Sequence, residues 1–333
     1  MTRKNINIYW GEYKLRNRIT ELLGVQYPII QGGLHQLGRS QLVTAVAEAG
    51  AFGLITASSY DNKVEMQEDI ERVRKKTKKP FGVNMSIGIR NNTEQFVDGI
   101  IESGISIVFT SGYSPEKYMK QFRDNNVKVI HVVPSIQYAK KAEELGCSGV
   151  VAVGKECGGH PGRNAYSTLH LMPEIVKSVR VPVIAAGGFY DGKGLAIAQI
   201  LGCEAVQYGT RFVMTQEIPL HQNIKQLFLK ASRENTLIIK ESIGKPNRVY
   251  QSIIAEKVLE LEKNNAPIEK LLPYIGGEAY KKMLETGDIN HGVISVGECI
   301  GFINDIPTVD DLIKRIMHEY RYSIEGLNHL LLI

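Results

Sequence analysis

Residues 151–162, VAVGKECGGHPG, carry the most informative pattern in this chain. The pattern begins as an apolar run typical of a buried strand and continues into a glycine-rich loop that carries His160. Gly158 and Gly159 allow a positive φ and a close approach of the backbone to a ligand, and Pro161 restricts the loop where it ends. A histidine after the carboxyl end of a strand can face a cleft and titrate near neutral pH. An isolated GGH sequence is equally typical of a structural turn, so the choice between a turn and a functional site depends on the rest of the chain.

Composition and charge indicate a globular protein. The chain has 333 residues, of which 43% are hydrophobic and 23% charged, with a formal net charge of +5. The basic run RVRKKTKK at residues 72–79 is typical of the solvated last turns of a helix, and no nucleic-acid-binding module accompanies it. The first fourteen residues contain no apolar segment like that of a signal peptide, and no run reaches the length of a membrane span. We therefore expect a cytoplasmic protein that binds neither nucleic acid nor membrane.

The cysteines agree with a reducing compartment. Cys147, Cys157, Cys203 and Cys299 form no CxxC pair, and we expect neither a disulfide nor a metal site. Cys157 lies in the glycine-rich loop, where a packing role is expected and a nucleophilic role is the alternative.

One strand–helix unit repeats along the first two thirds of the chain. Helix-length segments with apolar residues at helical spacing include residues 40–49, 64–76, 115–125 and 136–145. Helical stretches end at Gly50, Gly104, Gly146 and Gly202, as glycine at a helix C′ position would. Eight such units predict an α/β fold, a TIM (β/α)₈ barrel; a doubly wound open sheet fits less well, because no GxGxxG opens the first unit. The apparent strands are residues 27–31, 52–56, 81–85, 105–110, 127–132, 149–153, 183–186 and 205–208.

The pattern changes after the eighth strand. Residues 215–290 are charged and helical, without a strand-like run, and we interpret them as a helical insertion that covers the barrel mouth. The apolar, glycine-rich residues 291–303 are expected to pack back toward the mouth, and residues 309–320 form the last helix. The barrel would then comprise residues 1–214 and 291–333.

Glycines after the seventh and eighth strands predict a phosphate site. Gly187 and Gly188 follow the seventh strand, and Gly209 and Thr210 follow the eighth and open a helix. In barrels of this type a phosphate often binds between these two loops, held by backbone N–H groups. Each pair alone is equally typical of a tight turn.

Two further strand ends suggest that the ligand has a flat ring. The first strand ends in Gly32 and Gly33, which permit a close approach, and the third ends near Asn84, whose amide can both donate and accept. The alternative role for Asn84 is a local cap. Together the strand ends predict a phosphorylated, planar cofactor across the barrel mouth.

Five ordered motifs resemble those of the nitronate monooxygenase (2-nitropropane dioxygenase-like) flavoproteins. They are YPIIQGG, FGVN, ECGGHPG, IAAGGFYDGKGLA and VQYGTRF, and the likeness spans residues 17–320. That group includes NAD(P)H:quinone reductases and a flavin-type enoyl-ACP reductase. The resemblance implies a TIM barrel with non-covalent FMN, and NADH or NADPH as a co-substrate.

The resemblance also assigns roles to residues. It makes His160 the active-site acid or base, and His35 and His131 are weaker candidates with structural roles as alternatives. The other matching positions contact the flavin or its phosphate: Gly32, Gly33, Leu34, Asn84, Gly158, Gly159, Gly187, Gly188, Gly209 and Thr210.

The branch within the family stays open. QGG after the first strand resembles the reductase branches. ECGGHPG with GGFYDGKGL resembles the quinone reductases, whereas VVPS at residues 132–135 resembles the enoyl reductase. Val133 stands where the quinone reductases have lysine, Val153 where both reductase branches have an acidic residue, and Glu298 departs from an AGQ-type segment.

The resemblance therefore implies an oxidoreductase that oxidises alkyl nitronates or uses NAD(P)H to reduce a small molecule such as a quinone or enoyl thioester. A homodimer is a further expectation. A flavin-binding carrier or sensor without turnover is one alternative; a phosphosugar isomerase or aldolase is another, although no Schiff-base lysine or catalytic carboxylate stands at a strand end.

Overall fold

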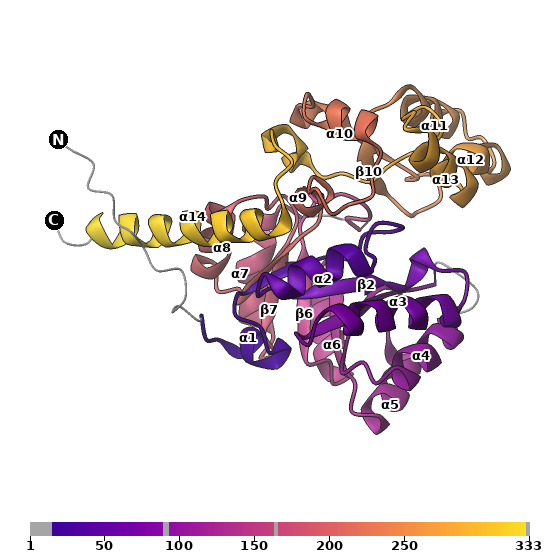
Figure 1. The fold of residues 1–333 in the computed structure, drawn as a ribbon. Helices are drawn as coiled ribbons and strands as arrows, with labels where there is room; N and C mark the ends of the chain where they lie inside the picture. The colour runs from indigo at the N-terminus through magenta and orange to yellow at the C-terminus, as the bar shows by residue number, and fades with distance from the viewer. Residues whose placement is uncertain (1–14, 89–92, 163–165, 331–333) are drawn as a thin grey trace.

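The computed structural model describes residues 15–88, 93–162 and 166–330, so the N-terminal segment considered above lies outside the described residues. Its main sheet is parallel, in the order β1-β8-β7-β6-β5-β4-β3-β2 (Figure 1). An additional parallel bridge between Ile30 and Phe52 joins the β1 and β2 edges and closes the barrel. The predicted TIM barrel is confirmed. The strands are β1 (Ile29–Gln31), β2 (Gly53–Thr56), β3 (Phe81–Ile87), β4 (Ile107–Gly112), β5 (Lys128–Val133), β6 (Gly149–Val153), β7 (Val183–Ala186) and β8 (Ala205–Tyr208).

The strands are buried on both faces, which explains their continuous apolar runs. One set of side chains fills the barrel interior, including Leu54, Phe109, Ile130, Val151 and Ile184. The alternate side chains pack against the surrounding helices. The short helix α1 (Arg18–Leu23) inserts Ile19 and Leu23 among the interior side chains, so it plugs the amino end of the barrel. A ligand site is therefore expected at the opposite end, the barrel mouth, which is formed by the loops that follow the strands.

The expected helices surround the sheet. The glycines that were predicted to end them, Gly50, Gly104, Gly146 and Gly202, all have positive φ between 60° and 90°. The run of cations at residues 72–79 includes the last turn of its helix, as expected. The helices along the barrel are α2 (Ser40–Glu48), α3 (Lys63–Lys76), α4 (Thr93–Glu102), α5 (Glu116–Asp124), α6 (Ile136–Glu144), α7 (Thr168–Ser178), α8 (Gly192–Ile200), α9 (Thr210–Val213) and α14 (Val309–Leu330). Helix α14 is longer than predicted, and it lies beside α8 (Figure 1). The hydroxyl of Tyr320 on α14 donates a hydrogen bond of 2.5 Å to the side chain of Gln199 on α8.

Residues 215–290 contain helices, but the expectation that they hold no strand is wrong. An antiparallel hairpin of β9 (Thr236–Ile239) and β10 (Asn247–Tyr250) lies among them. An isolated two-stranded hairpin is at best marginally stable in water. This hairpin is stabilised by packing, because Ile239 and Val249 are buried against the neighbouring helices. This segment lies above the barrel, drawn in orange in Figure 1. Its helices are α10 (Gln222–Phe228), α11 (Ile253–Lys263), α12 (Ile268–Ile275) and α13 (Gly277–Thr286).

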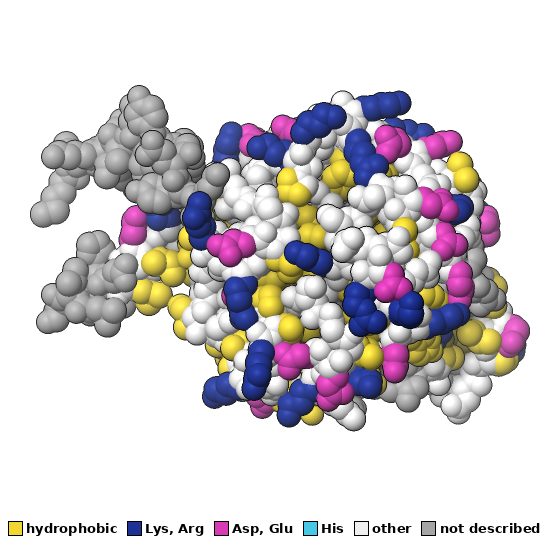
Figure 2. Space-filling model, turned by 90° about the horizontal axis from the view of Figure 1, so that it is seen from below, with side chains coloured by type: hydrophobic (Ala, Val, Ile, Leu, Met, Phe, Trp, Pro, Cys, Tyr) yellow, Lys and Arg dark blue, Asp and Glu magenta, His cyan; other side chains and the backbone are white. Residues whose placement is uncertain are grey.

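Figure 2 shows the face of the molecule seen from below, on the side away from the insertion. Lysine and arginine side chains are interspersed with aspartate and glutamate over the described part of this face, as in an ordinary solvated surface. Among the described residues, no helix combines the length and the apolar character needed to cross a bilayer.

Candidate functional site

The loop after β6 places His160 at the barrel mouth, held from two sides. Gly158 packs against residues 296–297, where an added Cβ would lie 2.6 Å from the carbonyl carbon of Val296. Gly159, with φ of 81°, exchanges two backbone hydrogen bonds with Arg248 of β10, with N–O distances of 3.0 and 2.7 Å. The sequence separation between Gly159 and Arg248 is large, so the insertion itself helps to shape the loop next to His160.

The start of the same loop is fixed by a carboxylate. Both oxygens of Glu156 accept hydrogen bonds from the backbone N–H of Thr168, at 3.1 and 3.0 Å, and one also accepts the Thr168 hydroxyl at 2.6 Å. Thr168 is the first residue of α7, and a negative charge there satisfies unpaired donors and suits the helix dipole. Glu156 therefore anchors the loop to the helix that follows it.

The loops after β7 and β8 lie side by side because these strands are neighbours in the sheet. Gly187 and Gly188 have φ of 103° and 81°, which favours glycine at both positions. At Gly209 no heavy atom lies within 4 Å of the position that a Cβ would take, so the backbone borders open space. Thr210 is buried, and its hydroxyl accepts a hydrogen bond of 2.8 Å from the backbone of Gly297. The structure brings together all four residues of the predicted phosphate site.

Gly33 and Asn84 meet at the far side of the mouth. A Cβ on Gly33 would overlap the side-chain amide of Asn84, so only glycine allows this approach. Asn84 is buried at 8% exposure and donates a weak 3.4 Å hydrogen bond to the carbonyl of Phe109. Leu34 follows, and its N–H donates to the Thr56 hydroxyl at 2.9 Å. Gly32 is held to β8 through a 2.9 Å hydrogen bond to the carbonyl of Tyr208.

These strand ends fit a phosphorylated planar cofactor. Open space adjoins the backbone of Gly209 and also that of Gly159, where a Cβ would meet no heavy atom within 4 Å. Gly187 and Gly188, both with positive φ, lie in the loop after the neighbouring strand, and backbone N–H groups of such loops can bind phosphate. Gly33 and Asn84 offer a small backbone surface and an amide to a ring. The residues predicted from the sequence to contact the cofactor therefore remain the candidates for holding such a group.

His160 has an electrostatic setting that the sequence did not indicate. Its Nε2 lies 3.2 Å from the Nζ of Lys240, which comes from the turn between β9 and β10. Loss of hydration within the surrounding protein, together with the nearby ammonium groups of Lys240 and Lys245, lowers the pKa of His160 to about 4. The ring nonetheless keeps an exposed surface at the mouth. The expectation that His160 titrates near neutral pH is therefore wrong: the imidazole is neutral at pH 7.

The two weaker histidine candidates have different positions. His35 lies at the mouth, where its Nδ1 is 3.2 Å from the Ser58 hydroxyl and its ring centroid 5.4 Å from that of Tyr280. His131 is buried on the outer side of the sheet, because its neighbours Ile130 and Val132 pack into the barrel interior. Its Nδ1 is 2.8 Å from the hydroxyl of Thr110. His131 thus has the packing role that was its alternative.

Cys157 also packs rather than reacts. All four cysteines are buried free thiols. Burial raises the pKa of Cys157 to about 12, so the nucleophilic thiolate is not populated at neutral pH.

The three departures from the family pattern occupy distinct places. Val133 is fully buried between sheet and helices, so its side chain offers no polar contact. Val153 lies in the barrel interior at the end of β6. Glu298 forms a 2.9 Å ion pair with Arg248, and its backbone N–H donates to the carbonyl of Glu156 at 3.0 Å. The segment at residues 291–303 therefore does pack back onto the mouth.

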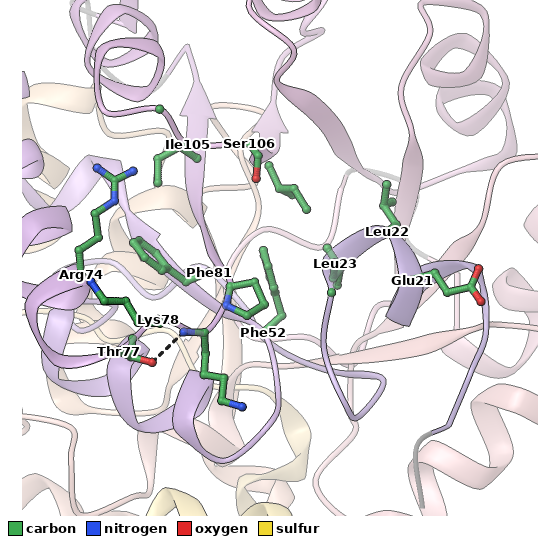
Figure 3. Close-up of a pocket in the computed structure, with 15 residues that line it drawn as sticks. Glu21, Leu22, Leu23, Phe52, Arg74, Thr77, Lys78, Phe81, Ile105 and Ser106 are labelled. Carbon is green, nitrogen blue, oxygen red and sulfur yellow. Dashed lines mark hydrogen bonds between the residues drawn. The ribbon is translucent and has the colours of Figure 1, made fainter.

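A recess of about 500 Å³ opens at the other end of the barrel. Figure 3 shows its lining, with Leu23, Phe52, Phe81 and the side chain of Arg74 around it. These residues precede or begin the strands rather than follow them. In barrels of this type chemistry is carried by the loops at the carboxyl ends, so this recess belongs to the stabilising end of the fold.

Sequence reasoning missed Lys240 and Arg248, the residues of the insertion that approach the loop of His160. A local signal for the hairpin existed, because the run TLII and the run RVY flank a turn-forming segment with Gly244 and Pro246. Nothing local could have predicted their contact with residues 159–160, which depends on the fold.

Comparisons with known proteins support the resemblance over most of the chain. The family model described as nitronate monooxygenase matches residues 16–319. The solved structure of FabK from Thermotoga maritima has a TM-score of 0.89 and 36% identity, covering 95% of this chain and 100% of its own. The (3aS,4S,5R,7aS)-5-hydroxy-7a-methyl-1-oxo-octahydro-1H-indene-4-carboxyl-CoA dehydrogenase of Mycobacterium tuberculosis is 32% identical over 95% of this chain and 98% of its length. A probable nitronate monooxygenase of Staphylococcus aureus is 29% identical over 74% of this chain and 81% of its length.

Proposed function

This chain belongs to the nitronate monooxygenase family of flavin-dependent oxidoreductases, and from that premise we propose that it is an FMN enzyme that uses NADH or NADPH to reduce an unsaturated thioester. The observation that carries the proposal is a neutral, solvent-facing His160 at a mouth whose glycines fit a phosphorylated cofactor. The thioester is favoured because FabK is an enoyl-ACP reductase and the mycobacterial relative is named for a CoA substrate.

The roles of the residues follow from their chemistry. FMN, when bound, supplies reversible two-electron transfer. Gly187, Gly188, Gly209 and Thr210 would hold its phosphate through backbone and hydroxyl donors, and Gly33 and Asn84 would border its ring.

Because the pKa of His160 is lowered, its neutral ring is a weak base at pH 7, but it still has one N–H that can donate a hydrogen bond. We assign His160 to the carbonyl oxygen of the thioester, where a hydrogen bond from the ring N–H polarises the conjugated double bond toward reduction.

A nitronate or nitroalkane is the second candidate substrate. It is favoured by the description of the family model. A quinone remains a third acceptor within the same reaction class.

Anaerobic half-reactions test the proposal. We expect the purified protein to release FMN rather than FAD on heating, and its flavin absorbance to bleach with NADH or NADPH. Crotonyl-CoA should then restore the colour faster than a quinone or oxygen does. Bleaching by propionate-3-nitronate but by neither pyridine nucleotide would overturn the reductase proposal and favour the second candidate.

Replacement of His160 tests its role. We expect His160→Asn to retain flavin and to lower turnover by at least roughly 10²-fold, the scale usual for a group that acts on the reacting atoms. His318→Asn is the matched control, because His318 is exposed on α14. Equal turnover in the two variants would remove His160 from the mechanism.

A further inference from the structure

We propose that Lys240 is a positioning residue for His160: its ammonium group donates to Nε2 and so holds the ring as the Nδ1–H tautomer. The other nitrogen is then the donor available to the substrate. This inference deepens the proposed function and rests on it for the statement that His160 contacts substrate; the tautomer itself does not depend on turnover.

The contact fixes the direction of the hydrogen bond. The Nζ of Lys240 lies 3.2 Å from the Nε2 of His160. A lysine ammonium group has three donors and no acceptor, so the ring nitrogen must accept. A neutral imidazole that accepts at Nε2 carries its proton on Nδ1. The opposite tautomer would bring two donors face to face.

The backbone at Lys240 shows that this placement is enforced. Lys240 has φ of 64°, a left-handed conformation that non-glycine residues rarely adopt. Such strained residues persist where the surrounding structure over-determines them, and they gather at functional sites. The cause here is Glu262 of α11, a buried side chain whose oxygens accept from the backbone N–H of Lys240 at 2.6 Å and of Ser242 at 3.0 Å.

The second end of the hairpin is fixed as well. Arg248 of β10 is bound to Gly159 by the backbone pair described above, and its guanidinium group forms the ion pair with Glu298 and donates to the carbonyl of Lys155 at 3.2 Å. The residue that precedes His160 and the residue that carries the ammonium group are thus parts of one rigid arrangement.

The charged groups that act on His160 come from one turn. Lys240 and Lys245 both disfavour the imidazolium form, while Glu262 interacts with Lys240. Lys245 is exposed and acts on His160 through charge alone, whereas Lys240 also lies within hydrogen-bond distance. Replacing each lysine in turn therefore distinguishes the effect of a nearby charge on His160 from the effect of a direct hydrogen bond.

The test is the tautomer of His160, read from the ¹⁵N resonances of protein labelled at histidine and assigned by their loss in His160→Asn. In the wild type at pH 7 we expect Nε2 to be unprotonated. Lys240→Met should move the ring toward the Nε2–H form and raise its midpoint of titration. Lys245→Met should leave the tautomer unchanged, and Lys240→Arg should restore the wild-type pattern, because arginine again supplies a donor.

Two results would overturn the inference: a wild-type ring protonated on Nε2, or a Lys240→Met spectrum identical to that of the wild type. If Lys240→Met does not fold, Lys240→Gly serves instead, because glycine suits the positive φ and also lacks the amine. The outcomes stay distinct from those for the proposed function. A wild-type ring without the Nδ1–H preference but with intact reductase turnover refutes only this inference, whereas a wild-type ring with the preference but without turnover refutes only the proposed function.

Discussion

Gly209 offers a way to test cofactor placement without disturbing the fold. The predicted phosphate site depends on backbone groups, which mutation seldom probes cleanly. At Gly209 a Cβ would meet no heavy atom within 4 Å, and φ is −107°, outside the range that demands glycine. In the flavin-free protein the methyl group of an alanine at this position would therefore project into open space. We expect Gly209→Ala to change the free energy of unfolding of the flavin-free protein by less than about 0.5 kcal/mol.

The same methyl group would occupy the space in which a phosphate meets the backbone. A hydrogen bond to a charged group contributes about 1.5–3 kcal/mol, so the loss of one such bond weakens FMN binding roughly 10- to 150-fold. Riboflavin has the same ring without the phosphate. Its affinity should change by less than about twofold, because on our proposal the ring binds elsewhere, near Gly33 and Asn84.

Quenching of flavin fluorescence, titrated with flavin-free protein, measures both dissociation constants. Gly33→Ala is the matched contrast: its Cβ would overlap Asn84, so it should lower stability by about 1–3 kcal/mol and weaken FMN and riboflavin alike. An equal loss for FMN and riboflavin in Gly209→Ala would place the phosphate elsewhere. Unchanged binding of both would show that no ligand approaches Gly209.

Two further predictions concern stability. Burial lowers the pKa of His131 from 6.5 to about 4, so the unfolded chain takes up a proton between these pH values that the folded chain does not. The contribution of His131 to the free energy of unfolding is therefore fully present above pH 6.5 and falls by up to about 3 kcal/mol on acidification to pH 4. Measured by urea unfolding, the free energy of unfolding of His131→Gln should depend less on pH than that of the wild type. An equal pH dependence in the two proteins would contradict this cause. Glu262→Gln should cost about 1–3 kcal/mol and speed hydrogen exchange at residues 240–245, because the amide replaces an acceptor that holds three donors. Glu260→Gln, exposed on the same helix, is the control, and equal exchange in the two variants would contradict the role of Glu262.

The barrel could be predicted because its signals are local and repeated. Residues 149–153, 183–186 and 205–208 form strands with the predicted bounds, since apolar β-branched runs between glycines favour buried parallel strands. The candidate site followed from the same logic: in a barrel every strand end faces the same mouth, so glycines far apart in the sequence converge.

What the sequence did not reveal depends on contacts between distant segments. The hairpin of β9 and β10 has strand-like composition, but it lies among charged helices, which masked it. The pKa of His160 is lowered first by burial and then by Lys240 and Lys245, which lie eighty or more positions along the chain, and no local sequence pattern predicts these contacts. The residue type alone suggested a histidine that titrates near neutral pH, whereas the tertiary environment lowers its pKa.

Glu298 shows how a departure from a family pattern can be explained by its partner. Considered alone, an acidic residue in an AGQ-type segment suggests an altered contact with substrate. In the structure its carboxylate pairs with Arg248, a side chain of 9% exposure that would otherwise carry its charge into the protein with little compensation. The backbone of Arg248 also holds Gly159. Residues 248 and 298 therefore act as a pair that fastens the insertion to the loop of His160. Relatives that lack one should lack the other, or should hold this loop by different means.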